Sequence, residues 1–172
     1  MHRSKPEPTI ASLILLSLYN DLGEHRAVFD EGLRRFGIDV RALHDPQGLL
    51  RLRSYVGILE WLAETLEDPW LGLRLGSRAG THALGALGYL FLCSRSLETA
   101  FRGASRYLEA NQTASTLNLI VHDDLVRIRY RITEDSIAPR RQDSEYSAAI
   151  TWRYMKLLCK SRCRLVQVRF EH

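Results

Sequence analysis

Aromatic side chains and two adjacent arginines are the residues of this sequence best suited to bind a small molecule. A small-molecule pocket is mostly apolar and aromatic, with a few fixed polar groups. The candidate aromatic residues lie in apolar segments and are Tyr89, Phe91, Tyr130, Tyr146, Trp152 and Tyr154. Arg140 and Arg141 follow one another in a loop, where guanidinium groups could hold a carboxylate or phosphate by paired hydrogen bonds. The sequence therefore predicts a binding site built from these residues.

The same residues also have a purely structural interpretation. The aromatic side chains are of a type that fills a hydrophobic core, and the arginines suit an exposed loop. The charge of a ligand also stays open, because Asp143 or Glu145 could select an amine as readily as the arginines select an anion.

Patterns for catalysis and metal binding are missing. Neither G-x-S-x-G, which positions a nucleophilic serine, nor H-E-x-x-H, which binds zinc, occurs. The six histidines are scattered, and His82, before a glycine-rich segment, is the one considered as a metal or haem ligand. Three cysteines are too few for a disulfide framework or a zinc site, and they indicate a reducing compartment. We expect no enzymatic activity, no metal and no cofactor.

The net charge is mild but unevenly placed. The 172 residues carry a net charge of +4, with 45% hydrophobic and 26% charged residues. That composition fits one globular domain and does not by itself indicate a nucleic-acid-binding protein. Residues 127–172 hold 11 basic and 5 acidic side chains. This surplus is typical of a solvated surface, or of a surface for an anion or a partner.

The N-terminal apolar run, residues 10–18, resembles the core of a signal peptide, with basic residues before it. Prolines interrupt the approach, no small-x-small cleavage site follows, and the run is too short to span a bilayer. We therefore expect a flexible tail over residues 1–8, then a first helix over 9–22 with Thr9 as its N-cap, in a cytoplasmic protein without membrane contact.

Hydrophobic periodicity predicts the elements that must position the candidate residues. Apolar residues recur at helical spacing over residues 9–22, 24–36, 52–66, 70–75, 84–93 and 97–111, with Ser96 as an N-cap and residues 84–93 buried. Glycines at 72, 76 and 80 are spaced by four, which lets two backbones approach closely. The period then changes to two over residues 117–132, which predicts a β-hairpin with an arginine-rich outer face.

A last helix is expected over residues 143–160, followed by a third strand at 166–170. The apolar arc of this helix is too wide for one sheet face, so another helix, a ligand or a second subunit should cover the rest. Glu145, Arg153, Lys156 and Lys160 form its narrow polar stripe. The predicted fold class is α+β: an N-terminal helical part packed on a small antiparallel sheet, with a long C-terminal helix.

Several segments together resemble the N-terminal effector-binding domain of AraC-type transcriptional regulators, the arabinose-binding-like branch. They are residues 67–76 (EDPWLGLRLG), 84–90 (LGALGYL), 96–101 (SLETAF), 106–108 (RYL) and 168–172 (VRFEH). The resemblance covers residues 9–172 and implies a cytoplasmic sensor domain, usually a homodimer, that responds to a small-molecule effector. It also implies about fifty further residues in the sensor and a helix-turn-helix DNA-binding domain, both missing from this sequence.

Two functions follow as hypotheses. The chain is a ligand-sensing regulatory domain whose effector shifts a dimer or conformational equilibrium and so controls transcription. The alternative is a dimerisation or protein-interaction module without a small-molecule site, in which the wide apolar face of the last helix meets a partner chain. An enclosed cavity between the last helix and the glycine-rich segment would favour the first function, and a solid core with a large apolar surface patch would favour the second.

Overall fold

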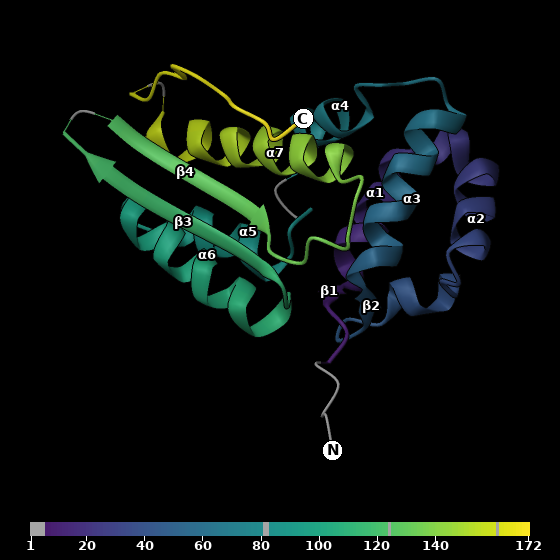
Figure 1. The fold of residues 1–172 in the computed structure, drawn as a ribbon. Coiled ribbons are helices and arrows are strands. Elements are labelled where there is room, and N and C mark those ends of the chain that lie inside the picture. The colour runs from purple at the N-terminus through teal and green to yellow at the C-terminus, as the bar shows by residue number, and fades with distance from the viewer. Residues whose placement is uncertain (1–5, 81–82, 124, 161) are drawn as a thin grey trace.

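The computed structural model describes residues 6–80, 83–123, 125–160 and 162–172 of the chain. The N-terminal part, on the right of Figure 1, is helical and is closed by a short antiparallel pair of strands. Its elements are β1 (Thr9–Ala11), α1 (Ser12–Asp21), the 3-10 turn η1 (Gly23–His25), α2 (Arg26–Arg35), the 3-10 turn η2 (Val40–His44), β2 (Leu49–Arg51) and α3 (Leu52–Thr65).

Among the described residues, the C-terminal part consists of a β-hairpin and four helices, and the hairpin contacts the last two of these helices. Its elements are α4 (Leu71–Arg78), α5 (Ala86–Cys93), α6 (Leu97–Asn111), β3 (Ser115–His122), β4 (Leu125–Ile132) and α7 (Arg141–Cys159). The hairpin lies on α6, and α7 crosses the molecule to reach the N-terminal helices (Figure 1). Because α7 contacts α3, α4, α5, α6 and β4, other helices cover the part of its apolar arc that the sheet leaves free.

The periodicity of α3 and of the hairpin is confirmed. Leu52, Tyr55, Leu59 and Leu62 form one buried stripe of α3, as helical spacing requires. In the hairpin, β3 and β4 pair antiparallel from Ser115 with Ile132 to His122 with Leu125. The arginines at 127, 129 and 131 are exposed on the outer face, so the α+β class follows from both helical and alternating patterns.

Two glycines of α4 allow it to pack directly on the backbone of α7. A Cβ atom at Gly76 would lie 2.5 Å from the carbonyl oxygen of Tyr146, and one at Gly72 would overlap the carbonyl group of Gln142. The backbone N–H of Gly72 also donates a hydrogen bond of 2.7 Å to the side chain of Gln142. The close approach expected from the glycine spacing is therefore confirmed at 72 and 76.

Several expectations about single elements are wrong. Thr9 does not cap a helix but pairs with Arg51 in the β1–β2 ladder, and α1 begins at Ser12. Helix α5 is not wholly buried. The side that carries Leu87 and Phe91 faces the core, whereas Tyr89 is 62% exposed. The chain from α4 to α5 includes His82, which lies outside the described residues.

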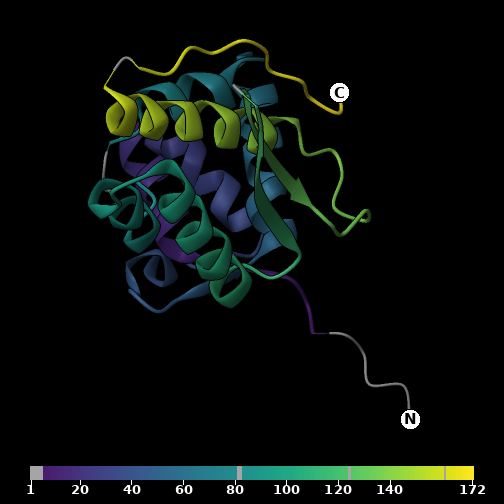
Figure 2. The same cartoon turned by 90° about the vertical axis from the view of Figure 1, so that its left-hand side faces the viewer.

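The C-terminal segment, residues 162–172, is not the expected third strand. It is extended but forms no β-ladder, and it runs back over α7 towards α4 on the side away from α6 (Figures 1 and 2). The thiols expected to be reduced are also paired, since Cys159 and Cys163 form a disulfide where α7 ends, with Cα atoms 5.7 Å apart. Cys93 is a free, exposed thiol.

Replacing Ser96 by alanine is expected to destabilise the protein by about 1 kcal/mol. Ser96 is the confirmed N-cap of α6, where its Oγ accepts a 3.2 Å hydrogen bond from the backbone N–H of Thr99. Urea unfolding measures the change. Ser105→Ala, inside the same helix, is the matched control and should be neutral or slightly stabilising, since alanine has the higher helix propensity. Equal losses in both variants would show that the cap contributes nothing specific.

Candidate functional site

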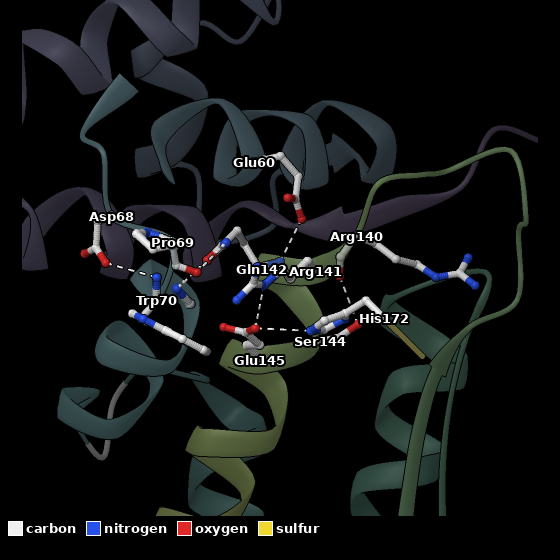
Figure 3. Close-up of polar contacts among 11 residues, drawn as sticks. Glu60, Asp68, Pro69, Trp70, Arg140, Arg141, Gln142, Ser144, Glu145 and His172 are labelled. Carbon is white, nitrogen blue, oxygen red and sulfur yellow. Dashed lines mark hydrogen bonds and ion pairs between the residues drawn. The ribbon is translucent and has the colours of Figure 1, made fainter. Parts of the chain in front are cut away.

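The first turn of α7 is held in place by polar contacts to α3 and to the start of α4 (Figure 3). The Gln142 backbone N–H donates to a Glu60 carboxylate oxygen at 2.7 Å, and its side-chain Nε2 donates to the Pro69 carbonyl at 3.2 Å. Gln142 is buried, so these bonds, together with the one it accepts from Gly72, satisfy its polar groups. They fix the register between α7 and α4.

Charged groups at the same end of α7 hold the C-terminal segment. Glu145 was expected on an exposed polar stripe, but its carboxylate is buried. It accepts a 2.8 Å hydrogen bond from Nε of Arg141 and lies 3.1 Å from Nε2 of His172. Arg140 forms a 2.9 Å ion pair with Glu171, and this partner lowers the pKa of the Glu171 carboxyl. Both arginines proposed for ligand binding therefore have carboxylate partners within the chain.

A second polar cluster lies inside the fold, beneath the hairpin. The Asp143 carboxylate is 2% exposed and accepts a 3.0 Å hydrogen bond from the Tyr130 hydroxyl. Burial raises the pKa of Asp143 from 3.8 to about 6, although hydrogen bonds from Tyr130 and Tyr55 lower it. The Tyr146 hydroxyl is buried without a hydrogen-bond partner among the described residues. The cluster is surrounded by core side chains and is packed into the interior.

A groove lies between α4, α7 and the C-terminal segment. Its volume is about 490 Å³, within the range of about 300 to 1,000 Å³ typical of small-molecule sites. Apolar and aromatic side chains dominate the lining. The lining residues are Trp70, Leu73, Arg74, Ser77, Ala148, Ala149, Trp152, Arg153, Lys156, Leu165, Val168 and Phe170. We call it the α4–α7 groove.

The lining of the α4–α7 groove contains cations and no carboxylate. Arg74 is bound to Asp68, its Nε lying 2.8 Å from a carboxylate oxygen. Arg153 donates through Nη1 to the Ser77 carbonyl at 3.2 Å, whereas its Nε is buried and has no hydrogen-bond partner in the described part of the chain. Lys156 lies 6.0 Å from the Trp152 ring. The groove can therefore offer an apolar wall and positive charge to a ligand.

The structure disperses the residues predicted from sequence. Trp152 lines the groove. The guanidinium carbon of Arg141 lies 5.0 Å from the ring centroid of Trp70, which is another lining residue. Phe91 and Tyr154 pack against each other in the core with ring centroids 5.4 Å apart. Tyr130 and Tyr146 lie near Asp143, Arg140 binds Glu171, and Tyr89 is on the surface. The predicted set does not form one site, and its role in ligand binding stays a prediction.

Several groove residues were not predicted from the sequence, because the residues around them do not form a pattern typical of a binding site. The sequence pattern predicted Trp70 to be part of a short helix, and it predicted Arg153 and Lys156 to lie on the polar stripe of the last helix. Leu165, Val168 and Phe170 have the alternating pattern of a strand, and here they line a recess. One signal was available, since Gly72 and Gly76 place α4 directly against α7 and so identify the two helices that form the groove.

Known proteins similar to this chain are transcription regulators. Residues 29–172 match the family model of the arabinose-binding domain of AraC transcription regulator, N-terminal. The chain is 33% identical over 145 residues to the HTH-type transcriptional regulator VirS of Mycobacterium tuberculosis, which covers 81% of this chain and 42% of that protein. It is 32% identical over 124 residues to the ornithine utilization regulator of Pseudomonas aeruginosa, covering 71% and 35% respectively.

These similarities define the class as a regulatory domain of bacterial transcription regulators. The chain belongs to the arabinose-binding domain family of AraC transcription regulators. It spans about two fifths of the length of the curated relatives it matches. No helix among the described residues is long and apolar enough to cross a membrane.

Proposed function

We propose that this chain senses a small-molecule effector on behalf of an AraC-type regulator and binds that effector in the α4–α7 groove. The groove is the observation that carries the proposal, because it combines a volume suited to a small molecule with an apolar, aromatic lining and a few cations. Membership of an arabinose-binding domain family supports ligand sensing. Only one of the two relatives is named after a process, ornithine utilization, and the identity of the effector is not carried over from either.

The groove also gives a ligand a way to change the rest of the protein. One wall is the C-terminal segment, which is held at its end by Glu171 and His172. An effector that contacts Leu165, Val168 or Phe170 binds one position of this segment better than another. A ligand shifts an equilibrium only through such a difference in affinity. The segment is therefore the proposed element through which effector binding alters conformation or dimerisation.

The remaining parts of the proposal concern the whole regulator. We propose a cytoplasmic homodimer that controls transcription without catalysing a reaction. DNA contact is assigned to a helix-turn-helix region outside these 172 residues, since the first relative is named an HTH-type regulator and is matched over only 42% of its length.

A second candidate function is a protein-interaction module. The tip of the hairpin exposes Ile120, Val121, Leu125 and Val126, each at least 42% accessible. Exposed apolar side chains at unpaired strand edges are a common feature of association surfaces. This function needs no small-molecule site and predicts dimerisation that is independent of any ligand.

A thermal-shift screen of the 172-residue chain against metabolites tests the proposed function. A groove ligand present at a hundred times its dissociation constant is expected to stabilise the fold by about 2.7 kcal/mol. Ala148→Phe places a ring in the groove and should abolish the response, whereas Ala27→Phe, on the exposed side of α2, is the matched control and should keep it. Sedimentation with and without the ligand then reports the dimer equilibrium.

Two results would contradict the proposal. A screen without any stabilising compound, together with a dimer that forms through the hairpin tip, would favour the interaction module. An Ala148→Phe variant that responds as strongly as the unmodified chain would place the ligand site outside the groove.

A further inference from the structure

We infer that the α4–α7 groove selects an anionic effector, a small carboxylate with an apolar or aromatic body, over neutral and cationic analogues. The inference rests on the proposed function and specifies its ligand class. It follows from three features of the groove: a guanidinium Nε–H without an acceptor, a second cation without a carboxylate partner, and an aromatic wall.

Arg153 supplies the first feature. Its Nη1 is occupied by the Ser77 carbonyl, but its Nε–H is shielded from water and has no acceptor among the described residues. A buried donor without an acceptor costs free energy, and such a group in a native structure calls for an explanation. A carboxylate oxygen from a ligand in the groove would accept this hydrogen bond. Hydrogen bonds between two charged groups are about twice as strong as neutral ones.

Lys156 supplies the second feature. Its ammonium group is one turn beyond Arg153 on α7 and lines the same groove. No Asp or Glu carboxylate of the described residues forms an ion pair with Lys156 or with Arg153. The remaining lining cation, Arg74, is already bound to Asp68. The uncompensated positive charge of the groove is therefore concentrated on α7, where one carboxylate can meet both cations.

The rest of the lining determines the body of the ligand. Trp70 at the N-cap of α4, Trp152 of α7 and Phe170 of the C-terminal segment present aromatic side chains to the groove. These walls stabilise an apolar or aromatic body, since burial of apolar surface contributes roughly 25 cal/mol per Å². An ammonium or guanidinium head group would meet like charge at Lys156 and Arg153 and would leave the Nε–H of Arg153 without an acceptor. The groove therefore discriminates against amines.

The buried carboxylates at the start of α7 do not reverse this preference. Glu145 is bound by Arg141 and His172, and Glu60 accepts the backbone N–H of Gln142. Neither residue lines the groove. The Oε2 atom of Glu145 has no hydrogen-bond partner among the described residues, but it is buried outside the groove lining.

Three compounds that share an indole ring test the inference: indole-3-acetate, its neutral amide indole-3-acetamide, and the cation tryptamine. Calorimetric titration of the 172-residue chain is expected to show indole-3-acetate binding at least about tenfold more tightly than the amide, with tryptamine the weakest. The advantage of the acid over the amide should shrink as salt is raised, because the groove is open to solvent and its charges are screened.

Charge-removing variants locate the effect. Arg153→Gln and Lys156→Gln should each reduce the affinity for indole-3-acetate by about tenfold while leaving the affinity for the amide nearly unchanged. Lys156 is exposed, so its variant is expected to fold normally even if Arg153→Gln does not. Arg129→Gln, on the exposed outer face of the hairpin, removes the same charge elsewhere and should change neither affinity.

Several outcomes would overturn the inference. Equal binding of acid and amide, preferred binding of tryptamine, or an unchanged acid preference in both α7 variants would each exclude anion selection by this groove. Failure of all three indoles, while compounds of another class bind and are blocked by Ala148→Phe, would also exclude the ligand class and leave the proposed function intact. Failure of every compound in the metabolite screen would instead reject the proposed function itself.

Discussion

Replacing Gly76 by alanine is expected to destabilise the protein by about 3 kcal/mol, at the upper end of what overpacking a core costs. The added Cβ atom would lie 2.5 Å from the Tyr146 carbonyl oxygen and 2.8 Å from Cβ of Ala149. The first of these atoms belongs to the backbone of α7, so it cannot move away by rotating a side chain. Relief requires α4 and α7 to separate, which disturbs the wall of the α4–α7 groove as well as the core.

Urea unfolding measures this loss, and Gly103→Ala provides the matched control. Gly103 is inside α6, and a Cβ atom there would make an ordinary contact of 3.7 Å with Leu90. Because alanine is the better helix former, this control should stabilise the protein by up to about 1 kcal/mol. If Gly76→Ala is as harmless as Gly103→Ala, the two helices do not pack backbone to backbone. Gly72→Ala should behave like Gly76→Ala, since its Cβ would meet the carbonyl group of Gln142.

Asparagine in place of Asp143 is expected to remove a contribution to stability that depends strongly on pH. Burial raises the pKa of this carboxyl from 3.8 to about 6 in the folded protein. A raised pKa means that the folded state favours the protonated form. The stabilisation is therefore complete below about pH 3.8 and is lost as the pH rises through 6. At about 1.4 kcal/mol for each unit of pKa, the loss amounts to about 3 kcal/mol.

The groups around Asp143 support the sign of this prediction. Glu60 raises the pKa of Asp143, Arg140 lowers it, and the Tyr130 and Tyr55 hydroxyls stabilise the charged form, yet burial outweighs the favourable contacts. Asparagine stays neutral and its side-chain oxygen can still accept the hydrogen bond from Tyr130.

The measurement compares free energies of unfolding of Asp143→Asn and the unmodified protein from pH 4 to pH 7.5. The variant should gain about 2.5 kcal/mol relative to the unmodified protein across this range, because part of the effect has already occurred at pH 4. Glu109→Gln, at an exposed position of α6, is the control and should show a far smaller pH-dependent difference, because its side chain stays in water. A difference for Asp143→Asn that is constant with pH would mean that the carboxyl is hydrated in the folded state.

Hydrophobic periodicity and capping residues correctly predicted the elements that depend mainly on residues close together in the sequence. The stripe from Leu52 to Leu62 defined α3, Ser96 defined the start of α6, and the alternation after residue 116 defined the hairpin. Where competing contacts come from far along the chain, the local pattern was a poorer guide. Thr9 has the composition of an N-cap, but its backbone N–H donates to Oγ of Thr113, a distance of 104 residues in the chain.

In the candidate site, too, contacts between residues far apart in the chain decide what local patterns could not. Aromatic residues on α5 and α7 were predicted to line a pocket, because sequence does not distinguish a core aromatic from a pocket aromatic. Phe91 and Tyr154 pack against each other in the core with their rings tilted. Glu145 was placed on a polar stripe, yet it is buried and contacts Arg141 and His172. Its partners Arg141 and His172 lie 4 and 27 residues away in the chain, and the second of these contacts is not visible in a local pattern.

By itself the sequence determined the α+β class, most of the helices, the hairpin, the close contact at the α4 glycines and the resemblance to AraC regulators. These properties depend on periodicity, backbone freedom and residue type, all of which are local. Tertiary structure alone decided where the groove lies and which charges in it lack partners. Its walls come from α4, α7 and the C-terminal segment, and α4 ends at Arg78 whereas α7 begins only at Arg141, so their proximity depends on the tertiary packing.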